Sequence, residues 1–269
     1  MRDDEREALA RVLYYLMKWV FIGPLLRLFF RPEVEGLEHL PAEGGAILAS
    51  NHLAVADSFF LPLMLPRRVT FPAKLEYFTQ PGLKGKFKKA FFTGVGQIPI
   101  DRSSGSAAQA ALDTGIRLLR EGHLLGIYPE GTRSPDGRLY KGKTGMARIA
   151  LQAGVPVIPV AMFGTDKANP IGSKMWKPTK IRIKLGAPMD FSRYEGLAGD
   201  RFIERSITDE IMYTLMELSG QEYVDMYAAK AKELASAQEK GQPADLPKQT
   251  QRQVPTATEA DRVPQTEAG

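Results

Sequence analysis

Six short apolar runs, separated by polar segments, most limit how this 269-residue chain can fold. Several of the intervening segments carry apolar residues at every third or fourth position, the pattern of a helix packed on one side. Apolar runs that alternate with such helices are typical of α/β domains. We therefore predict an α/β fold, a mixed central sheet flanked by helices, although the pattern does not specify strand order. The predicted strands are Ala46–Ser50, Val69–Ala73, Gln97–Ile100, Leu124–Tyr128, Pro156–Met162 and Ile181–Leu185, and the helices Ser106–Glu121, Lys143–Ala153 and Phe202–Ser219.

Composition excludes some chemistry and favours anionic partners. The chain has no cysteine, which rules out disulfide bonds, thiol catalysis and cysteine-ligated metals. Its formal charge of +5 suits phosphate compounds, nucleic acid or an anionic membrane. The three histidines, His39, His52 and His123, show no metal-ligand spacing, so we predict no metal site. Residues 236–269 contain four prolines and no aromatic residue, which predicts a disordered polar tail.

The N-terminal residues 8–31 are apolar but interrupted by charges, and their longest uncharged stretch, Trp19–Leu26, is eight residues. A spanning helix needs about 20 apolar residues, so a transmembrane segment is not predicted. We expect residues 1–34 to form two amphipathic helices that dock on a membrane, separated by a break or kink at Gly23-Pro24. A pair of core helices in a soluble domain and a shallow hairpin in one leaflet remain alternatives.

A second candidate for membrane contact is the basic stretch 67–92, which holds seven basic residues and one acidic residue, a net charge of +6. Leu83, Phe87 and Phe91 recur every four residues there, with lysines on another face. Aromatic residues beside lysines favour binding to anionic lipid. A solvated helix face is the alternative interpretation.

Residues 51–57, with the sequence NHLAVAD, place an imidazole and a carboxylate directly after a predicted strand. On one continuous helix, His52 and Asp57 would point about 140° apart, at roughly 100° per residue. They can meet if the strand ends in a turn and Asp57 opens the next helix. A carboxylate bound to one ring nitrogen would fix the tautomer, leaving the other nitrogen to take a proton from a hydroxyl. This spacing also arises by chance, so an unrelated pair stays open on this pattern alone.

Two further polar turns follow predicted strands, at 96–102 (GQIPIDR) and 128–134 (YPEGTRS). In α/β sheets, ligands bind beyond the carboxyl ends of strands. The guanidinium groups of Arg102 and Arg133 could bind phosphate as planar forks, and Gly131 would let the backbone approach a ligand closely. In isolation, each turn could equally be a surface ion pair or a plain turn.

Taken in order, NHLAVAD at 51–57, GQIPIDR at 96–102, YPEGTRS at 128–134 and VPVIPVAM at 155–162 resemble the four sequence blocks of the glycerolipid acyltransferases. The resemblance is closest to the 1-acylglycerol-3-phosphate (lysophosphatidate) acyltransferases. It extends over about residues 1–220 and implies an acyltransferase domain at 35–225. It does not reach the tail.

The resemblance also implies roles for individual residues. His52 would be the general base, oriented by Asp57. The matching blocks imply substrate phosphate binding by Arg102, Glu130, Gly131, Thr132, Arg133 and, through a weaker match, Lys74. The fourth block implies an acyl site at Val157, Ile158, Pro159 and Val160. Because proline interrupts a strand ladder, Pro159 favours an edge strand over a central one.

The reaction so implied moves a fatty acyl group from a thioester to the free hydroxyl of 1-acylglycerol 3-phosphate, giving phosphatidate. No cofactor is expected beyond the co-substrate, acyl-CoA or an acyl carrier protein thioester. The expected location is the cytoplasmic face of a membrane, in monotopic or peripheral contact with an anionic surface. Another acceptor, such as glycerol 3-phosphate or a different lysophospholipid, and a non-catalytic membrane-binding homologue remain alternatives. Nucleic-acid binding is not expected, since no recognition motif accompanies the basic charge.

Overall fold

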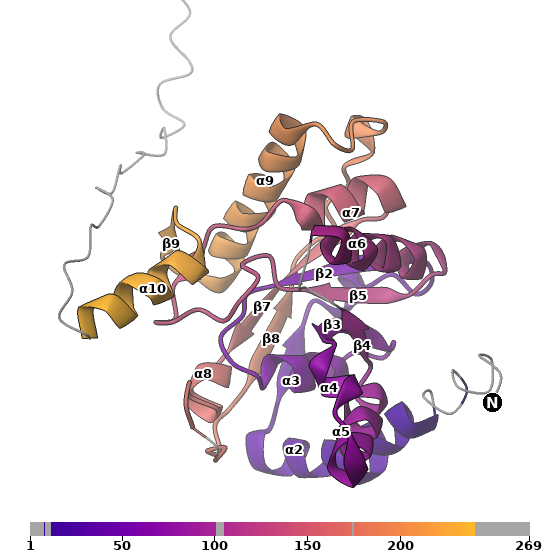
Figure 1. The fold of residues 1–269 in the computed structure, drawn as a ribbon, viewed down its shortest axis with the longest axis vertical. Coiled ribbons are helices and arrows are strands. Elements are labelled where there is room, and N and C mark those ends of the chain that lie inside the picture. The colour runs from indigo at the N-terminus through magenta and orange to yellow at the C-terminus, as the bar shows by residue number, and fades with distance from the viewer. Residues whose placement is uncertain (1–7, 9–11, 101–104, 174, 240–269) are drawn as a thin grey trace, which may run out of the picture. The chain divides into compact units, whose positions relative to one another are not determined.

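The computed structural model describes residue 8 and residues 12–100, 105–173 and 175–239. Within these residues, seven strands form one sheet in the order β1-β8-β7-β2-β5-β3-β4, while β6 and β9 pair separately (Figure 1). Neighbouring strands described in the large sheet are parallel except for β7 and β8, which confirms the predicted mixed α/β sheet. The strands are β1 Glu33–Glu35, β2 Ala46–Ser50, β3 Val69–Lys74, β4 Gln97–Ile100, β5 Leu124–Ile127, β6 Leu139–Tyr140, β7 Val157–Phe163, β8 Arg182–Leu185 and β9 Tyr223–Val224.

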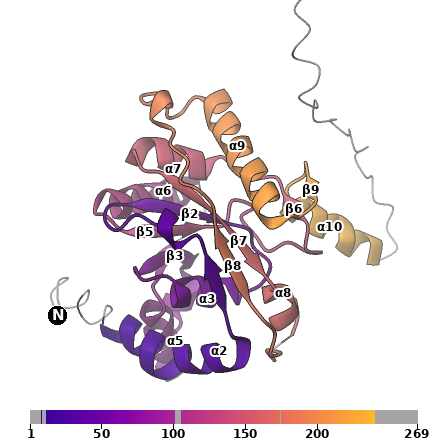
Figure 2. The same ribbon diagram turned by 180° about the vertical axis from the view of Figure 1, so that it is seen from behind.

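Helices cover both faces of this sheet, with α2 and α3 on one face and α6, α7 and α9 on the other (Figure 2). All six predicted strands are present, each within one residue of its predicted ends. The short strands β1, β6 and β9 were not predicted, because two or three residues make no apolar run. The helical elements are η1 Met17–Phe21, α2 Ile22–Phe30, η2 Leu37–His39, α3 Asp57–Met64, α4 Glu76–Thr79, α5 Gly82–Gly94, α6 Gly105–Arg120, α7 Gly145–Ala153, α8 Thr165–Ala168, η3 Ser192–Tyr194, α9 Arg201–Ser219 and α10 Ala228–Glu239.

The N-terminal segment is helical without interruption from Val12 to Phe30, so of the predicted break or kink at Gly23-Pro24 the break is wrong. Proline lacks an N–H, and its ring collides with the carbonyl four residues earlier in a regular α-helix. Here a π-helical turn, η1, comes just before α2 and accommodates the proline. A β-carbon on Gly23 would lie 1.6 Å from the Lys18 carbonyl oxygen, so this turn requires glycine at that position.

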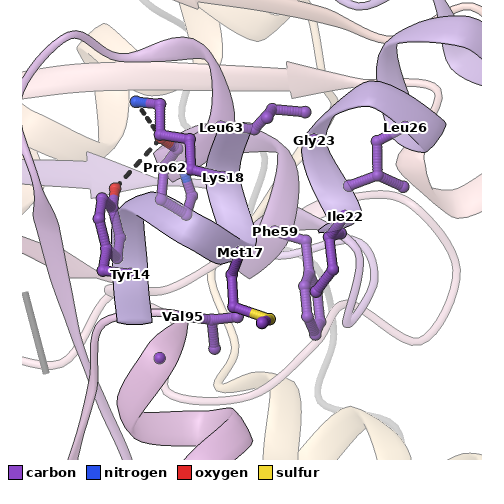
Figure 3. A pocket seen from close by; sticks show the side chains of 11 residues that line it. Tyr14, Met17, Lys18, Ile22, Gly23, Leu26, Phe59, Pro62, Leu63 and Val95 are labelled. Atoms are coloured by element: carbon purple, nitrogen blue, oxygen red, sulfur yellow. Dashed lines mark hydrogen bonds between the residues drawn. The ribbon is translucent and has the colours of Figure 1, made fainter. Parts of the chain in front are cut away.

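The charged side chains of this helix point toward the protein, as Figure 3 shows for Lys18. Lys18 is buried, and its ammonium donates to the carbonyl of Pro62 at 3.0 Å and to that of Leu65. The Arg27 guanidinium donates to the carbonyl of Leu63 at 3.1 Å. These carbonyls lie at the C-terminal end of α3, where helix carbonyls lack intrahelical partners and the helix dipole favours cations.

The outward face of the same helix is therefore apolar. Its length and hydropathy would allow it to cross a membrane, which the interrupted sequence did not predict. Only 22% of its most apolar window is buried. The exposed large apolar residues along it are Val12, Tyr15, Leu16, Trp19, Val20, Phe21, Leu25, Leu28 and Phe29.

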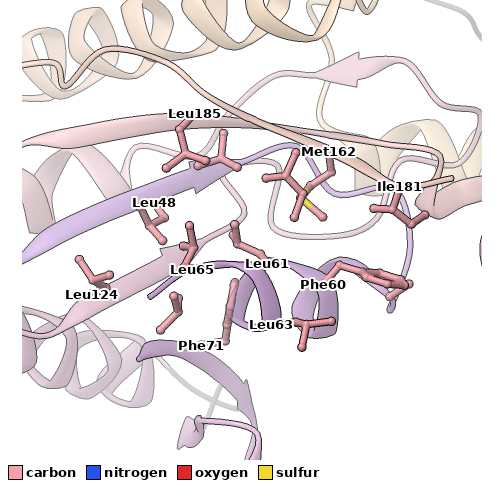
Figure 4. Packing of buried hydrophobic residues seen from close by; sticks show 14 of the residues in the cluster. Leu48, Phe60, Leu61, Leu63, Leu65, Phe71, Leu124, Met162, Ile181 and Leu185 are labelled. Atoms are coloured by element: carbon pink, nitrogen blue, oxygen red, sulfur yellow. The ribbon is translucent and has the colours of Figure 1, made fainter. Parts of the chain in front are cut away.

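Two apolar clusters, one on each face of the sheet, make up the core. Successive residues of β2 alternate between them: Ala46 and Leu48 belong to one cluster, Ile47 and Ala49 to the other. The first cluster packs β2 and its neighbours against Phe60 and the other apolar residues of α3 (Figure 4). Each fully buried leucine or phenylalanine there contributes about 1.5–3 kcal/mol relative to exposure. This packing fixes α3, and with it the residue at its N-terminus, against the sheet.

Pro159 lies in β7, an interior strand between β2 and β8, so the predicted edge strand is wrong. The ladder between β7 and β8 shifts register at this point, from the pair Val157–Met189 to the pair Val160–Leu185. The Pro159 carbonyl still accepts a hydrogen bond from the Gly186 N–H at 2.8 Å. Proline is tolerated at such a bulge, because the irregular ladder does not need its missing N–H.

The basic residues of the stretch 67–92 lie on different elements and do not all share one surface. The Arg67 guanidinium binds the carbonyls of Pro41, Gly44 and Gly122, and so ties together loops that precede β2 and β5. Lys74 ends β3, and the other four lysines lie on α5, which also exposes Leu83 and Phe87. Arg67 is thus a structural residue and not part of a lipid-facing surface.

Beyond the sheet, α9 is capped at its N-terminus by Asp200, whose side chain accepts from the N–H groups of Phe202 and Ile203. The chain then divides into two compact units, Met1–Lys232 and Glu233–Gly269. Residues 236–239, placed in the predicted tail, are helical and belong to α10. The remainder of the predicted tail lies outside the described residues, and the predicted domain boundaries stay predictions.

We expect Gly126→Ala to destabilise the fold. A β-carbon on Gly126 in β5 would lie 2.2 Å from the ring of Phe71, which is itself buried. Forcing a methyl group into such a site costs about 1–3 kcal/mol. Gly145→Ala is the matched control, because its methyl group would meet Leu112 at an ordinary 3.5 Å and alanine favours helix α7. Urea unfolding would measure both variants, and equal free energies of unfolding would contradict this account.

Candidate active site

The polar turns after β2 and β5 lie side by side at the carboxyl edge of the sheet. The two strands are parallel neighbours, so both chains leave the sheet at the same edge. The backbone N–H of Ser134 donates to the carbonyl of His52 at 2.7 Å, which joins the turns directly. The structure thus brings together two of the three polar turns that the sequence predicted to meet.

His52 and Asp57 form a hydrogen-bonded pair in which His52 Nδ1 lies 2.9 Å from Asp57 Oδ2. Asp57 is the first residue of α3, and the chain bends between β2 and this helix, as the spacing required. The same oxygen accepts from the backbone N–H groups of Leu53 at 2.8 Å and Ala54 at 2.9 Å. An ionised carboxylate only accepts, so Nδ1 carries the hydrogen and Nε2 keeps a lone pair. The Asp57 side chain is fully buried, whereas 16% of the His52 side chain is exposed.

An aromatic stack holds the other side of the imidazole. The ring of Tyr128 lies 3.7 Å from that of His52, centroid to centroid, with an angle of 8° between the planes. Phe71 stacks on Tyr128 in turn. The Tyr128 hydroxyl hydrogen-bonds the Ser58 hydroxyl at 2.8 Å, and burial raises its pKa well above the usual range, with a further contribution from Asp57. Tyr128 is therefore a neutral surface that fixes the plane of the His52 ring.

Glu130 braces the two turns from inside the protein. Its carboxylate accepts from the backbone N–H of His52 at 3.2 Å and from that of Tyr140 at 2.9 Å. It is almost completely buried, and this burial raises its pKa to about 7, opposed by those two hydrogen bonds. A buried carboxylate whose two oxygens both bind backbone groups is a positioning residue. We revise the expectation that Glu130 contacts a phosphate accordingly.

The next three residues of this turn lie closer to solvent. Gly131 has a φ of 74°, a conformation that favours glycine, and it is exposed. Thr132 and Arg133 are half-buried, and the Thr132 hydroxyl accepts a hydrogen bond from the Lys232 ammonium at 2.7 Å. Within the residues that the structure describes, the Arg133 side chain makes no hydrogen bond or ion pair. This guanidinium is therefore available to an anion.

One predicted phosphate ligand, Lys74, belongs to a strand on the neighbouring part of the same sheet. Lys74 ends β3 and pairs with Ile100, the last residue of β4, and both strands run parallel to β5. Arg102 lies outside the described residues. Its role, like that of the Lys74 side chain, stays a prediction.

The predicted acyl-site residues Val157, Ile158, Pro159 and Val160 are all buried inside the sheet. Val157 packs into one core cluster, and Ile158 and Val160 into the other. Residues that fill the core on both faces of an interior strand do not line an open site. We therefore withdraw these four as the walls of an acyl site and regard them as structural support for the neighbouring strand β2.

Several residues that shape the site were not predicted. The Asn51 side chain crosses to β7, where it accepts from the Met162 N–H at 2.8 Å, and it also donates to the Gln221 side chain at 2.7 Å. These bonds hold the residue directly before His52. Asn51 and Tyr128 stood inside the recognised blocks, which was a signal for them, whereas Gln221 lay outside every block.

A small apolar pocket separates the N-terminal helix from α3 (Figure 3). Its volume is about 30 Å³, room for roughly two water molecules and too little for an acyl chain. Among the described residues, no group of three His, Asp or Glu side chains is arranged to hold a metal ion.

Comparison with known sequences gives consistent matches. The Acyltransferase family model matches residues 31–163. A 1-acyl-sn-glycerol-3-phosphate acyltransferase from Limnanthes alba is 35% identical over 176 residues, which are 65% of this chain and 58% of that protein. The chain therefore spans just over half the length of that relative. The protein of the same name from Bacillus subtilis is 31% identical over 159 residues, 58% of this chain and 73% of that protein.

A solved structure has a similar fold. The crystal structure of the 1-acyl-sn-glycerophosphate (LPA) acyltransferase PlsC from Thermotoga maritima superimposes with a TM-score of 0.57 at 25% sequence identity, covering 82% of this chain and 85% of that one. The residues matched by the family model, 31–163, contain both the His52 and the Arg133 turns. The chain accordingly belongs to the acyltransferase family that includes the 1-acyl-sn-glycerol-3-phosphate acyltransferases.

Proposed function

We propose that this protein transfers a fatty acyl group from an acyl thioester to the free hydroxyl of 1-acylglycerol 3-phosphate, producing phosphatidate. The observation that carries the proposal is the His52–Asp57 pair beside a turn whose Arg133 guanidinium has no partner among the described residues, in a chain of this family. The relatives' names supply the acceptor, and the thioester donor is the one that the resemblance of the sequence blocks implies. The donor is acyl-CoA or an acyl carrier protein thioester.

The proposed chemistry needs one base and no covalent enzyme intermediate. Nε2 of His52 takes the proton of the acceptor hydroxyl as its oxygen attacks the thioester carbonyl carbon. A C–O bond forms, the C–S bond breaks, and the leaving thiolate recovers the proton from the imidazolium. Asp57 orients the ring and stabilises its transient positive charge, and the stack on Tyr128 prevents its rotation. Arg133, with Arg102 and Lys74, holds the acceptor phosphate so that the hydroxyl stays within reach.

Membrane association is part of the proposal, because both lipid substrates partition into bilayers. The outward apolar face of the N-terminal helix would lie in the hydrocarbon boundary of one leaflet. Gly94 of α5 packs on Leu13 and Met17 of that helix, and α2 and α5 lie side by side in both views (Figures 1 and 2). The exposed lysines of α5 would then meet anionic head groups. We place the protein on the cytoplasmic face, where such donors are found.

His52→Ala should leave a folded protein whose kcat is lower by about 100- to 10,000-fold, the usual contribution of a general base. Asp57→Asn should also lower kcat, since the carboxamide does not fix the tautomer in the same way. The matched control is His123→Ala, because His123 lies near Glu121 just before β5, at the opposite edge of the sheet. Steady-state acyl-transfer rates would test the three variants, and normal turnover by His52→Ala would contradict the mechanism.

The raised pKa of Glu130 predicts a pH-dependent stability. Between the ordinary glutamate value of 4.5 and the folded value of about 7, the folded protein holds a proton that the unfolded chain releases. This contribution is complete below pH 4.5 and is lost as pH rises through 7. Its size is about 3 kcal/mol at 1.36 kcal/mol per pKa unit.

Urea unfolding of wild type and Glu130→Gln at pH 5 and pH 8 would test this. The free energy of unfolding of the wild type should fall more steeply with rising pH, because a glutamine has no proton to release. The same pH dependence in both proteins would refute the assignment. The variant should also lose activity, since an amide can satisfy only one of the two backbone N–H groups with its oxygen.

Trp19→Glu with Leu28→Glu should release the protein from vesicles. Phe202→Glu is the matched control, because Phe202 is 85% exposed but lies on α9, on the other face of the sheet. Lys84→Glu should weaken binding to anionic vesicles by at least roughly fivefold, at about 1 kcal/mol per lysine near the surface, with little effect on neutral vesicles. Flotation assays would measure all of these, and equal release by Phe202→Glu would exclude a specific docking face.

A further inference from the structure

Three cations gather around the exposed turn Gly131–Arg133, and only one of them belongs to the recognised sequence blocks. Arg133 is part of the turn itself. A β-carbon on Gly131 would lie 2.9 Å from Lys143 Cε and 3.1 Å from its Nζ, so the Lys143 ammonium lies over this glycine. The Lys232 ammonium donates to the Thr132 hydroxyl at 2.7 Å. The last of these residues follows the family match by about seventy positions.

The fold, and not a flexible contact, brings Lys232 to the turn. Strand β9 pairs with β6, whose residue Tyr140 is tied through its N–H to Glu130. The Lys141 N–H and ammonium bind the β9 segment in addition, at the Val224 carbonyl and the Asp225 carboxylate. The first turn of α10 follows at once, with Ala228 fully buried. Lys232 is thus positioned by the same strand pair that positions the Glu130 brace.

The charge of this cluster is not neutralised within the described part of the chain. The side chains of Arg133 and Lys143 make no hydrogen bond or ion pair with described residues, and Lys232 binds a neutral hydroxyl. Glu130 is the nearby acid, but its oxygens are engaged by backbone groups. Burial lowers the pKa of Lys232, and the neighbouring Arg133 lowers it further, against an opposing effect of Glu130. Two cations held close without an anion between them favour an anionic ligand.

We propose that Lys232 is a further phosphate-binding residue, which exchanges the Thr132 hydroxyl for an oxygen of the acceptor phosphate and selects a phosphate monoester over a diester. This inference rests on the proposed function. A monoester carries about −1.5 to −2 charges at pH 7, whereas a diester carries one. Three cations offset the larger charge, and a diester would also place a head group among them. The segment beyond the family match would therefore contribute to the choice of acceptor.

The test compares wild type, Lys232→Ala, Lys232→Arg and the control Lys230→Ala, which removes an exposed lysine from the same helix. Calorimetric titration with glycerol 3-phosphate, with glycerol as blank, measures phosphate binding without any reaction. Acyl-transfer rates are then measured with lysophosphatidate and with lysophosphatidylcholine, varying acceptor and acyl-CoA separately.

Lys232→Ala should weaken glycerol 3-phosphate binding and lower kcat/KM for lysophosphatidate by roughly 10- to 100-fold, the usual loss for one charge-assisted hydrogen bond. The rate with lysophosphatidylcholine and the KM for acyl-CoA should change little, and Lys232→Arg should restore most of the loss. Lys230→Ala should resemble wild type.

Unchanged phosphate binding in Lys232→Ala would overturn the proposal. So would an effect confined to a higher KM for acyl-CoA, because Lys232 would then bind the donor and not the acceptor. Equal losses with both acceptors, accompanied by a lower melting temperature, would reveal a purely structural lysine and overturn it too. If wild type binds glycerol 3-phosphate through Lys232 but transfers no acyl group, the proposed function fails while the binding site stands.

Discussion

The pairing of β2 with β5 as parallel neighbours is the constraint on which the site depends. It sends two polar turns out of the sheet at one edge, where His52 and Ser134 join through a single backbone hydrogen bond. The buried Glu130 carboxylate strengthens this junction by accepting a hydrogen bond from the His52 N–H. The imidazole is then fixed on one side by Asp57 and on its face by Tyr128. An imidazole held in this way would need no rearrangement before it accepted a proton in the proposed reaction.

α3 connects this site to the N-terminal helix. Its N-terminal residue is Asp57, and its C-terminal carbonyls bind Lys18 and Arg27 of the N-terminal helix. A negative side chain at the first position and positive side chains at the last turn both complement the helix dipole. The proposed catalytic carboxylate thus lies at one end of α3, and the proposed membrane-docking helix contacts the other end. Displacement of the N-terminal helix would leave the carbonyls of α3 without partners.

Much of this was predictable from sequence, and the exceptions have physical causes. Apolar runs identify buried strands directly, so the sheet was found, and a bend before Asp57 was the one geometry that let it reach His52. Side-chain direction was harder, because a spacing of nine residues places Lys18 and Arg27 on opposite sides of a regular α-helix, at about 100° per residue. The π-helical turn η1 includes Lys18 and precedes Arg27, and in the structure both side chains reach the carbonyls of α3. Pro159 was assigned to an edge strand because the bulge that accommodates it depends on the register of the partner strand β8, which its own sequence does not specify. Lys232 lies 100 residues from Thr132, and no local pattern connects residues at that separation.

The inward direction of Lys18 and Arg27 also bears on membrane topology. A helix of 19 residues is long enough to thread through a bilayer. Doing so would take both cations from the carbonyls of α3 into hydrocarbon, at about 2.5–3.5 kcal/mol for each charge near the centre of the bilayer. Packing the N-terminal helix against α3 removes that cost and leaves apolar side chains on its outward face. The same two residues that bind the carbonyls of α3 would therefore disfavour insertion of the N-terminal helix across a membrane.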